Sequence, residues 1–251
     1  MPYEMIQESP FVYEIDVRNL KGEVKHVNTN LYFLGKLLNQ MNKGFSPLIL
    51  ICGRQRSGKS FIAQLVARWI LQAYSKYEYY DPTKNTLYEP EKTIKKLGGI
   101  MEDVIVVDEA GAIMGRRQWF EQTHSALEKI IQTQGYRNFC FLFISPFGSD
   151  IDKIFLKHFD FLIRVDYRGK FKVFKILKRY DELNAYKIEK MFLDDIRYNL
   201  GDVPANVWDI YEKYSFEQKE KLRKKYSSKK QDKPIDPIDA LRKALKKAGA
   251  S

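Results

Sequence analysis

The stretch from Leu48 to Ser60, LILICGRQRSGKS, decides how we expect this chain to fold. Its first five residues are all apolar, which is typical of a strand that is buried on both faces of a parallel sheet. From Phe61 to Tyr74 the apolar side chains then recur at helical spacing. The sequence therefore predicts a buried strand, a glycine-rich turn and an amphipathic helix in direct succession.

The turn matches the pattern G-x-x-x-x-G-K-[ST]. Glycines allow successive main-chain amides to point at phosphate oxygens, and the N-terminus of the following helix adds a partial positive charge. We expect Lys59 to reach the β- and γ-phosphates of ATP and the hydroxyl of Ser60 to hold Mg²⁺. The predicted nucleotide-binding residues are Gly53, Arg54, Gln55, Arg56, Ser57, Gly58, Lys59, Ser60 and Phe61.

A second buried strand, Val104 to Val107, ends in the acidic pair Asp108-Glu109. A carboxylate at the tip of a neighbouring strand can orient Mg²⁺, which is the role we predict for Asp108. Glu109 would then polarise the attacking water, so the pair indicates a hydrolase rather than a kinase. The alternative is a strand that simply ends in an acidic turn, but the Lys59 turn upstream favours the catalytic interpretation.

A third apolar run, Phe139 to Ile144, is followed by Ser145. A polar side chain at this position can contact the γ-phosphate, although serine before proline is also an ordinary strand end. ATPases of this kind often gain an arginine from a neighbouring subunit. We favour Arg137 for that role; the alternatives are Arg116, Arg117 and Arg164, and any of the four could instead be a surface charge or a DNA contact.

The remaining segments predict an N-terminal part, an α/β core with a mainly parallel sheet, and a helical, basic C-terminal part. Their predicted boundaries are 1–45, 46–180 for the ATPase core, 181–226 for a helical subdomain and 227–251 for a basic tail. Within them we expect strands at 11–17, 161–166 and 171–177, the last two as a hairpin, and helices at 31–41, 91–97, 122–134, 150–158, 208–226 and 238–247. Beyond Lys178 we expect helix, interrupted at Gly201 and Pro204.

Composition limits the setting in which we expect the protein to work. No apolar run reaches the roughly 18–20 residues that span a bilayer, and the acidic N-terminus does not resemble a secretory signal. The two cysteines, Cys52 and Cys140, are too few for a disulfide framework and are expected to be small, reduced core residues. A reducing compartment follows, and we expect the cytoplasm, which for a viral protein is that of the host.

Positive charge is concentrated toward the end of the chain. The net charge is +11, and residues 211–251 hold thirteen Lys or Arg against six Asp or Glu, 13 − 6 = +7. Such an excess indicates a polyanionic partner, most often nucleic acid, and we expect DNA. The alternative is a lysine-rich tail that only keeps the protein soluble.

The order of these motifs resembles that of a known family. An Asp-Glu strand, a helix and then a strand with a polar end place the third strand between the two motif strands, as in the additional-strand, catalytic-glutamate division of P-loop NTPases. The sequences VIVVDEAGAIMGRRQW, YRNFCFLFISP and SDIDKIFLKHFDFLIRV resemble zonula-occludens-toxin-like ATPases and the wider FtsK–HerA group of DNA motors. Length, Lys/Ile/Tyr richness and the basic tail resemble ATPases of spindle-shaped viruses of hyperthermophilic archaea.

This resemblance, over about Leu48 to Leu177, implies a three-layer RecA/AAA-like sandwich and a ring of subunits, often six, that threads DNA past basic loops. It implies that Gly53, Gly58, Lys59 and Ser60 bind nucleotide, that Asp108 binds Mg²⁺ and that Glu109 activates water. The chain departs from the family in having Ser145 where the motors commonly have Gln. It also has no membrane segment, which toxin-like members typically carry.

Two other classes share the same motifs. An AAA+ replication initiator or loader of the DnaA type would follow its third strand with a helical lid that carries an arginine, for which Arg197 is the candidate. The predicted hairpin from Phe161 to Leu177 argues against such a lid. A switch ATPase regulated by a partner, with no nucleic-acid role, is the third alternative.

Overall fold

The computed structural model describes residues 13–18, 24–29, 31–74, 80–88, 104–108, 139–145, 159–180 and 186–229. The chain divides into two compact units, Met1–Glu212 and Lys213–Ser251. The first unit contains the sheets and most of the helices, and the described part of the second unit consists of later turns of one helix. Among the described residues, no helix is both long enough and apolar enough to cross a membrane.

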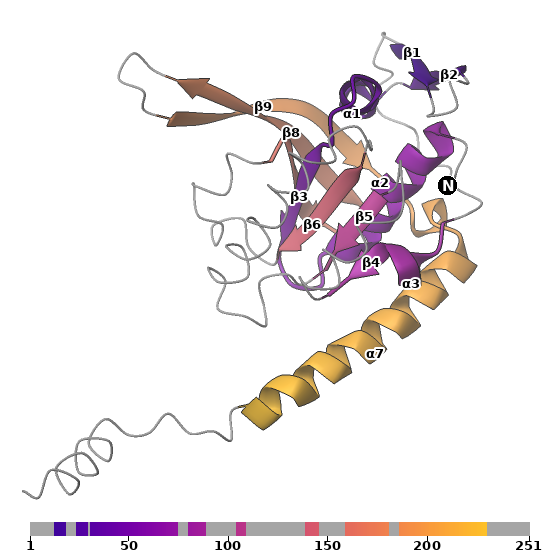
Figure 1. Cartoon of the computed structure of the whole chain (residues 1–251), viewed down its shortest axis with the longest axis vertical. Helices are drawn as coiled ribbons and strands as arrows, with labels where there is room; N and C mark the ends of the chain where they lie inside the picture. Colours follow the sequence, from indigo (N-terminus) through magenta and orange to yellow (C-terminus); the bar gives the residue numbers. More distant parts are fainter. Residues whose placement is uncertain are drawn as a thin grey trace, which may run out of the picture. The chain divides into compact units, whose positions relative to one another are not determined.

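Seven strands of the described residues form one sheet, in the order β4-β5-β6-β3-β7-β8-β9 (Figure 1). They are β3 (Leu48–Gly53), β4 (Thr86–Leu87), β5 (Val104–Val107), β6 (Cys140–Ser145), β7 (Phe161–Tyr167), β8 (Lys170–Tyr180) and β9 (Tyr186–Arg197). Neighbouring strands from β4 to β7 run parallel, whereas β8 is antiparallel to both β7 and β9. This mixed α/β structure with a mostly parallel sheet confirms the predicted class and is compatible with a P-loop NTPase fold.

Strand β6 lies between β3 and β5, as the motif order predicts. Its register pairs Ser145 with Cys52 of β3 on one side and Phe143 with Val107 of β5 on the other. Because parallel strands all end at the same edge of a sheet, the residues that follow β3, β5 and β6 meet there. The glycine-rich turn, Asp108 and Ser145 are therefore brought to one edge.

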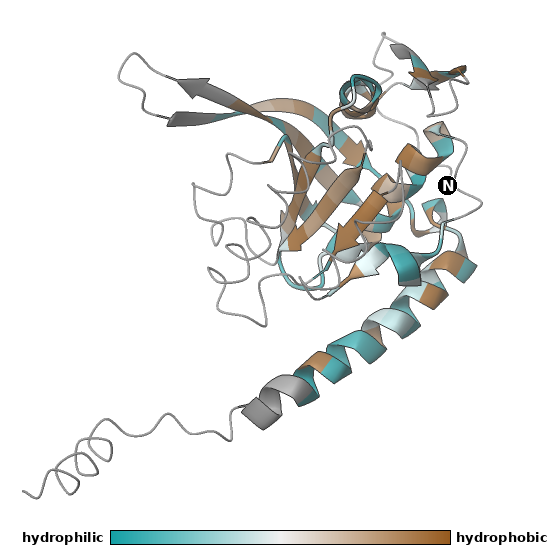
Figure 2. Ribbon diagram, in the orientation of Figure 1, coloured by the Kyte–Doolittle hydropathy of each residue, from teal (hydrophilic) through white to brown (hydrophobic). Residues whose placement is uncertain are grey.

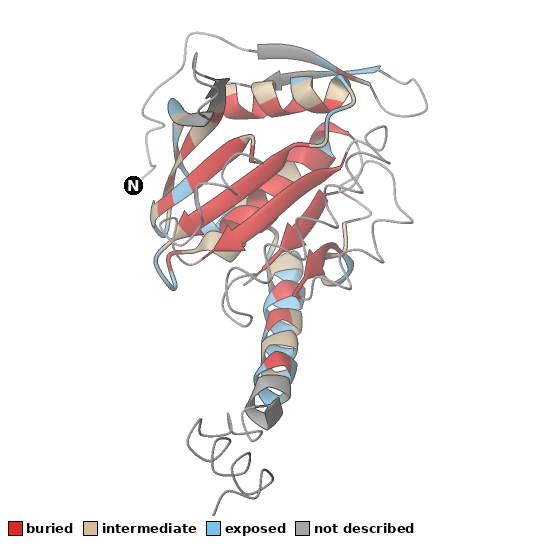
Figure 3. Cartoon of the chain, turned by 60° about the vertical axis from the view of Figure 1, so that its left-hand side comes forward, coloured by how far each residue is buried: buried red, intermediate tan, exposed pale blue. Residues whose placement is uncertain are grey.

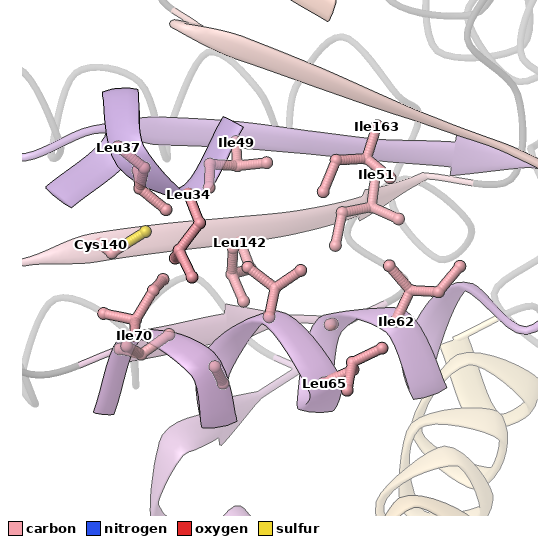
Figure 4. Close-up of a cluster of buried hydrophobic side chains, with 14 of the residues drawn as sticks. Leu34, Leu37, Ile49, Ile51, Ile62, Leu65, Ile70, Cys140, Leu142 and Ile163 are labelled. Atoms are coloured by element: carbon pink, nitrogen blue, oxygen red, sulfur yellow. The ribbon is translucent and has the colours of Figure 1, made fainter. Parts of the chain in front are cut away.

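Two helices cover one face of the sheet, α1 (Tyr32–Asn42) and α2 (Lys59–Ala73). Alternate residues of β3 separate the two faces: Ile49 and Ile51 belong to the core beneath the helices, and Leu48 and Leu50 to the core on the other side. Figure 4 shows side chains of α2 directed at those of β3 and β6. Strands β5 and β6 are buried at every position, and β3 is buried at every position before Gly53 (Figure 3), because both faces are apolar.

The chain continues past β7 as an antiparallel ribbon rather than as a helix. Strand β9 pairs with β8 along the whole of β8, from Lys170↔Arg197 to Tyr180↔Tyr186. The predicted hairpin is confirmed, but the helix that we predicted beyond Lys178 is wrong for residues 186–197. A register shift in β9 opposite Val173 and Phe174 leaves Leu193 without a partner in the ladder, which disrupts the alternation expected of a strand.

The smaller elements agree in part with expectation. Strand β1 (Tyr13–Arg18) and helix α1 confirm the predicted N-terminal strand and helix, and β1 pairs with a strand that was not predicted, β2 (Val24–Thr29). A short helix α3 (Pro82–Asn85) precedes β4, and a 3₁₀ turn (Leu200–Asp202) precedes α7 (Ala205–Lys229). Helix α7 confirms the predicted charged helix, and hydrophilic residues predominate along the coloured part of its ribbon in Figure 2.

Several predictions fall outside the described residues. They are the helices at 91–97, 122–134, 150–158 and 238–247. The helices at 122–134 and 150–158 would form the opposite helical layer of the predicted three-layer sandwich, so that layer stays a prediction. The four domain boundaries stay predictions as well.

Candidate functional site

The glycine-rich turn connects β3 directly to α2. Arg54, Gln55 and Arg56 are exposed, whereas Ser57 is buried. Helix α2 begins at Lys59, and its first intrahelical bond runs from the amide of Ile62 to the carbonyl of Gly58 at 3.0 Å. The amides of residues 59–61 precede that bond, so they are the helix N–H groups that could donate hydrogen bonds to a phosphate.

Two glycines in the turn are required by its geometry. Gly58 has φ +98°, a left-handed conformation that other residues rarely adopt, and a Cβ there would lie 2.8 Å from the hydroxyl of Tyr198. A Cβ on Gly53 would lie 2.8 Å from the carbonyl oxygen of Val165 on β7 and 2.9 Å from Oγ of Ser57. The turn is thus folded tightly against β7 and against the residue that follows β9.

Lys59 extends its side chain back over the turn. Its ammonium donates hydrogen bonds to the carbonyl oxygens of Gly53, at 3.0 Å, and Arg54, at 2.7 Å. This places a positive charge at the carboxyl end of β3. Burial raises the pKa of the Cys52 thiol in that strand, while Lys190, Arg164 and Lys59 act in the opposite direction. Three cations therefore act on this end of the strand, which suits a triphosphate.

Asp108 follows β5 and faces the first turn of α2. Its amide donates to the carbonyl of Leu87 at 3.0 Å, which continues the pairing of β4 and β5 and fixes the backbone at this point. The hydroxyl of Ser60 donates to Oδ2 of Asp108 at 3.3 Å. The two residues predicted to hold Mg²⁺ are thus brought together, 48 positions apart in the sequence.

The donor set fits a magnesium–nucleotide complex. Mg²⁺ prefers hard oxygen ligands, and a hydroxyl beside a carboxylate provides them. The helix amides and the Lys59 ammonium complement phosphate oxygens, and at Gly53 and Gly58 the turn has no room for a side chain. Nothing in the described part of the site opposes the group that the sequence predicts.

Two tyrosines at the site were not found by sequence reasoning. The hydroxyl of Tyr211, on α7, donates to Oδ2 of Asp108 at 2.6 Å, and that of Tyr88, just after β4, does so at 3.4 Å. Both residues are buried. They lie 103 and 20 positions from Asp108 and belong to no local motif, so the sequence carries no signal for them.

Phe61 was predicted to bind nucleotide, and its side chain is buried among other aromatic rings. It stacks on Tyr198 with ring centroids 5.3 Å apart and contacts Trp208 at 5.0 Å. Trp208 in turn packs on Tyr211 at 5.2 Å. The main-chain amide is therefore the group that Phe61 can offer a phosphate, while its ring supports the start of α7.

The remaining predicted residues are only partly described. Ser145 is buried at the end of β6. Arg164 is exposed on β7, where it pairs with Asp166 at 3.3 Å and lies over the ring of Phe174. Glu109, Arg116, Arg117 and Arg137 lie outside the described residues, so the roles of the base and of an arginine finger stay predictions.

Arg168 is an arginine near the turn that the sequence did not single out. It sits in the tight connection between β7 and β8, and its Nε donates to the carbonyl oxygen of Arg56 at 3.3 Å. Its Cγ lies 3.6 Å from the Cβ position of Gly58. The hairpin that the sequence predicted correctly therefore delivers a cation to the turn.

Comparisons with known proteins give only distant likenesses. No protein-family model and no curated protein match the sequence. Similar solved structures include B204, the DNA-packaging ATPase of Sulfolobus turreted icosahedral virus, with 15% identity, a TM-score of 0.37, and coverage of 59% of this chain and 98% of that one. Another is the genome-packaging NTPase B204 of Sulfolobus turreted icosahedral virus 2 in complex with ATP-γ-S, with 13% identity, a TM-score of 0.35 and the same coverage.

Proposed function

We propose that this chain binds Mg·ATP on the turn from Gly53 to Ser60 and hydrolyses it. The observation that carries the proposal is the pairing of Ser60 with Asp108 at 3.3 Å, beside a turn that opens a helix and holds the Lys59 ammonium. Lys59 and Ser60 follow the end of β3, and Asp108 follows the end of β5. The three residues therefore come from two strand ends at one edge of the sheet.

In this proposal the amides at the start of α2 and the Lys59 ammonium hold the phosphates. Ser60 and Asp108 hold Mg²⁺, which when bound neutralises charge on the β- and γ-phosphates. Glu109, next to Asp108 in the chain, accepts a proton from the attacking water. Ser145, at the end of the intervening strand, contacts the γ-phosphate, and Arg137 acts from a neighbouring subunit.

We assign the chain to the additional-strand, catalytic-glutamate type of P-loop NTPase. What supports this is the position of β6 between the strands that carry the turn and Asp108. Within that type we favour a DNA motor of the FtsK–HerA kind. Strand β8 carries five basic residues and no acidic ones, and the whole chain carries a net charge of +11, both of which suit phosphate contacts.

A replication initiator fits the structure less well. That alternative relied on a helical lid with Arg197, and Arg197 lies instead at the end of strand β9, paired opposite Lys170 of β8. Strands β8 and β9 extend the sheet beyond β7, and each runs antiparallel to its neighbour. A motor, in which such an extension follows the core directly, remains the better proposal.

The test is nucleotide binding and phosphate release by the full chain, with and without long duplex DNA. The Lys59→Ala variant should lose both activities, and Glu109→Gln should bind ATP yet turn it over about 10²–10⁴-fold more slowly. Lys43→Ala, which alters an exposed lysine just after α1, serves as the matched control and should keep normal binding. Absence of Mg·ATP binding by folded wild-type protein would overturn the proposal.

The DNA arm of the same experiment separates the classes. Turnover by a motor rises with any long duplex and falls steeply with salt, because the contacts are to phosphates. An initiator prefers one sequence and is loaded by ATP binding alone, whereas a switch ATPase ignores DNA. The particle mass in ATP shows whether subunits assemble into a ring.

A further inference from the structure

One carboxylate oxygen in the site accepts hydrogen bonds from hydroxyl groups on three segments of the chain. Among the described residues, Oδ2 of Asp108 accepts from Tyr211 at 2.6 Å, Ser60 at 3.3 Å and Tyr88 at 3.4 Å. Asp108 is 1% exposed and Tyr211 2%. A buried carboxylate needs donors of this kind, because water cannot solvate it there. The shortest of the three contacts comes from a residue that no motif includes.

The contact with Tyr211 has the character of a strong, charge-assisted hydrogen bond. An O–H···O distance of 2.6 Å is typical of a hydroxyl that donates to an ionised oxygen. Burial raises the pKa of Tyr211 well above its usual value, and the charge of Asp108 raises it further. The phenol has one proton, and it donates that proton to this oxygen.

The ring of Tyr211 is held in place by its neighbours. It packs on Trp208 with centroids 5.2 Å apart, and Trp208 contacts Phe61 at 5.0 Å. Phe61 follows Ser60 in the first turn of α2. The phenol and the Ser60 hydroxyl are therefore supported by one cluster of aromatic side chains, so their positions relative to Asp108 are linked.

Tyr88 is supported by a different segment of the chain. It follows β4, and that segment is attached to α2 through Gln64, whose side-chain amide donates to the hydroxyl of Thr86 at 3.3 Å. Gln64 is also buried and lies one turn after Ser60 on the same helix. Both tyrosines thus reach Asp108 from segments anchored to the helix that carries Ser60.

We propose that Tyr211 is a positioning residue for the magnesium site, with Tyr88 as a weaker second support. A serine hydroxyl has one proton and two lone pairs. While Oδ2 of Asp108 accepts the Ser60 proton, the serine oxygen keeps its lone pairs and can offer one of them to a cation. Mg²⁺ demands near-ideal geometry, so fixing the carboxylate favours metal binding. The inference rests on the proposed function, since it assumes that Ser60 and Asp108 hold Mg²⁺.

The experiment measures the Mg²⁺ dependence of nucleotide binding rather than turnover. A fluorescent ATP analogue is titrated onto the full chain in EDTA and then, at fixed nucleotide, with MgCl₂. Tyr211→Phe removes only the hydroxyl, and the Mg²⁺ midpoint should rise about 10-fold, the lower end of what the loss of a partner to a metal ligand costs. Tyr88→Phe, at the longer distance, should raise the midpoint by about 2- to 3-fold.

Tyr74→Phe is the matched control. Its hydroxyl donates to Asn42 at 3.5 Å, and it lies at the far end of α2, about 20 Å from Ser60 along the helix. Its Mg²⁺ midpoint should equal that of the wild type. Affinity for the nucleotide in EDTA should be the same in the wild type and in all three variants. A general loss of packing would instead lower this affinity.

The outcomes separate the two proposals. A folded wild-type protein that binds no nucleotide overturns the proposed function itself. If the wild type responds to Mg²⁺ and Tyr211→Phe has the same midpoint, the inference is wrong while the function stands. Equal loss of affinity in EDTA and in Mg²⁺ would also overturn the inference, because Tyr211 would then support the whole pocket rather than the carboxylate.

Discussion

The sheet has two halves that are built on different principles. From β4 to β7 the strands are parallel, and Val104–Val107 and Cys140–Ser145 are buried at every position. Beyond β7, strand β8 carries five cations, and Met191 and Phe192 of β9 are exposed. The parallel half excludes water from both faces, whereas the ribbon depends on its backbone pairing and on partial burial. The turn, Asp108 and Ser145 of the candidate site all lie at one edge of the first half.

The largest difference in stability is expected between a substitution in the parallel half of the sheet and one in the ribbon. Ile51 of β3 is fully buried, and Ile51→Ala should lower the free energy of unfolding by about 2–5 kcal/mol through lost burial and a cavity. Phe192 on the ribbon is 54% exposed, so Phe192→Ala should cost below about 1 kcal/mol. Urea denaturation measures both, and equal costs would remove the distinction between the halves.

A glycine pair tests the close approach of the turn to β7. Gly53→Ala introduces a Cβ 2.8 Å from the Val165 carbonyl oxygen, a backbone atom that cannot move aside alone, so a loss of about 1–3 kcal/mol is expected. Gly201→Ala is the control, because no atom lies within 4 Å of its Cβ position. Thermal unfolding of both variants gives the comparison, and a neutral Gly53→Ala would show that the turn is looser than described.

The most gradual effect concerns pH. Burial raises the pKa of the Cys140 thiol well above its ordinary value. The thiol in the unfolded chain titrates near pH 8.5, so this contribution to stability is complete below that pH. As pH rises further the unfolded state loses its proton first, and stability should fall by up to about 1.4 kcal/mol per pH unit. Denaturation at pH 7–10 measures the slope, and Cys140→Ala should flatten it; an equally steep slope in that variant would assign the loss to other groups.

The parallel half could be predicted because its signals are local. Residues 48–60 specify strand, turn and helix start without reference to the rest of the chain, and the apolar runs of β5 and β6 identify buried strands in the same way. The pairing of Ser60 with Asp108 then follows from the strand order, which the motif order predicted.

Strand β9 was predicted as helix because its local pattern suggests that structure. Ile188, Met191 and Phe192 are spaced by three and four residues, as on a helix face. Pairing with β8 overrides that spacing, and the register shift at Leu193 breaks the two-residue period that would have identified a strand. Tyr88 and Tyr211 escaped notice for a related reason, since only tertiary folding brings them to Asp108.

The hydroxyl that Tyr211 contributes has a practical consequence for anyone shortening this protein. A fragment that stops at the end of β9 would retain the whole seven-stranded sheet, the turn from Gly53 to Ser60 and both predicted magnesium ligands. It would nevertheless withdraw the strongest donor from a carboxylate that is sealed from solvent. The smallest self-sufficient version should therefore extend through Glu212, where the first compact unit ends.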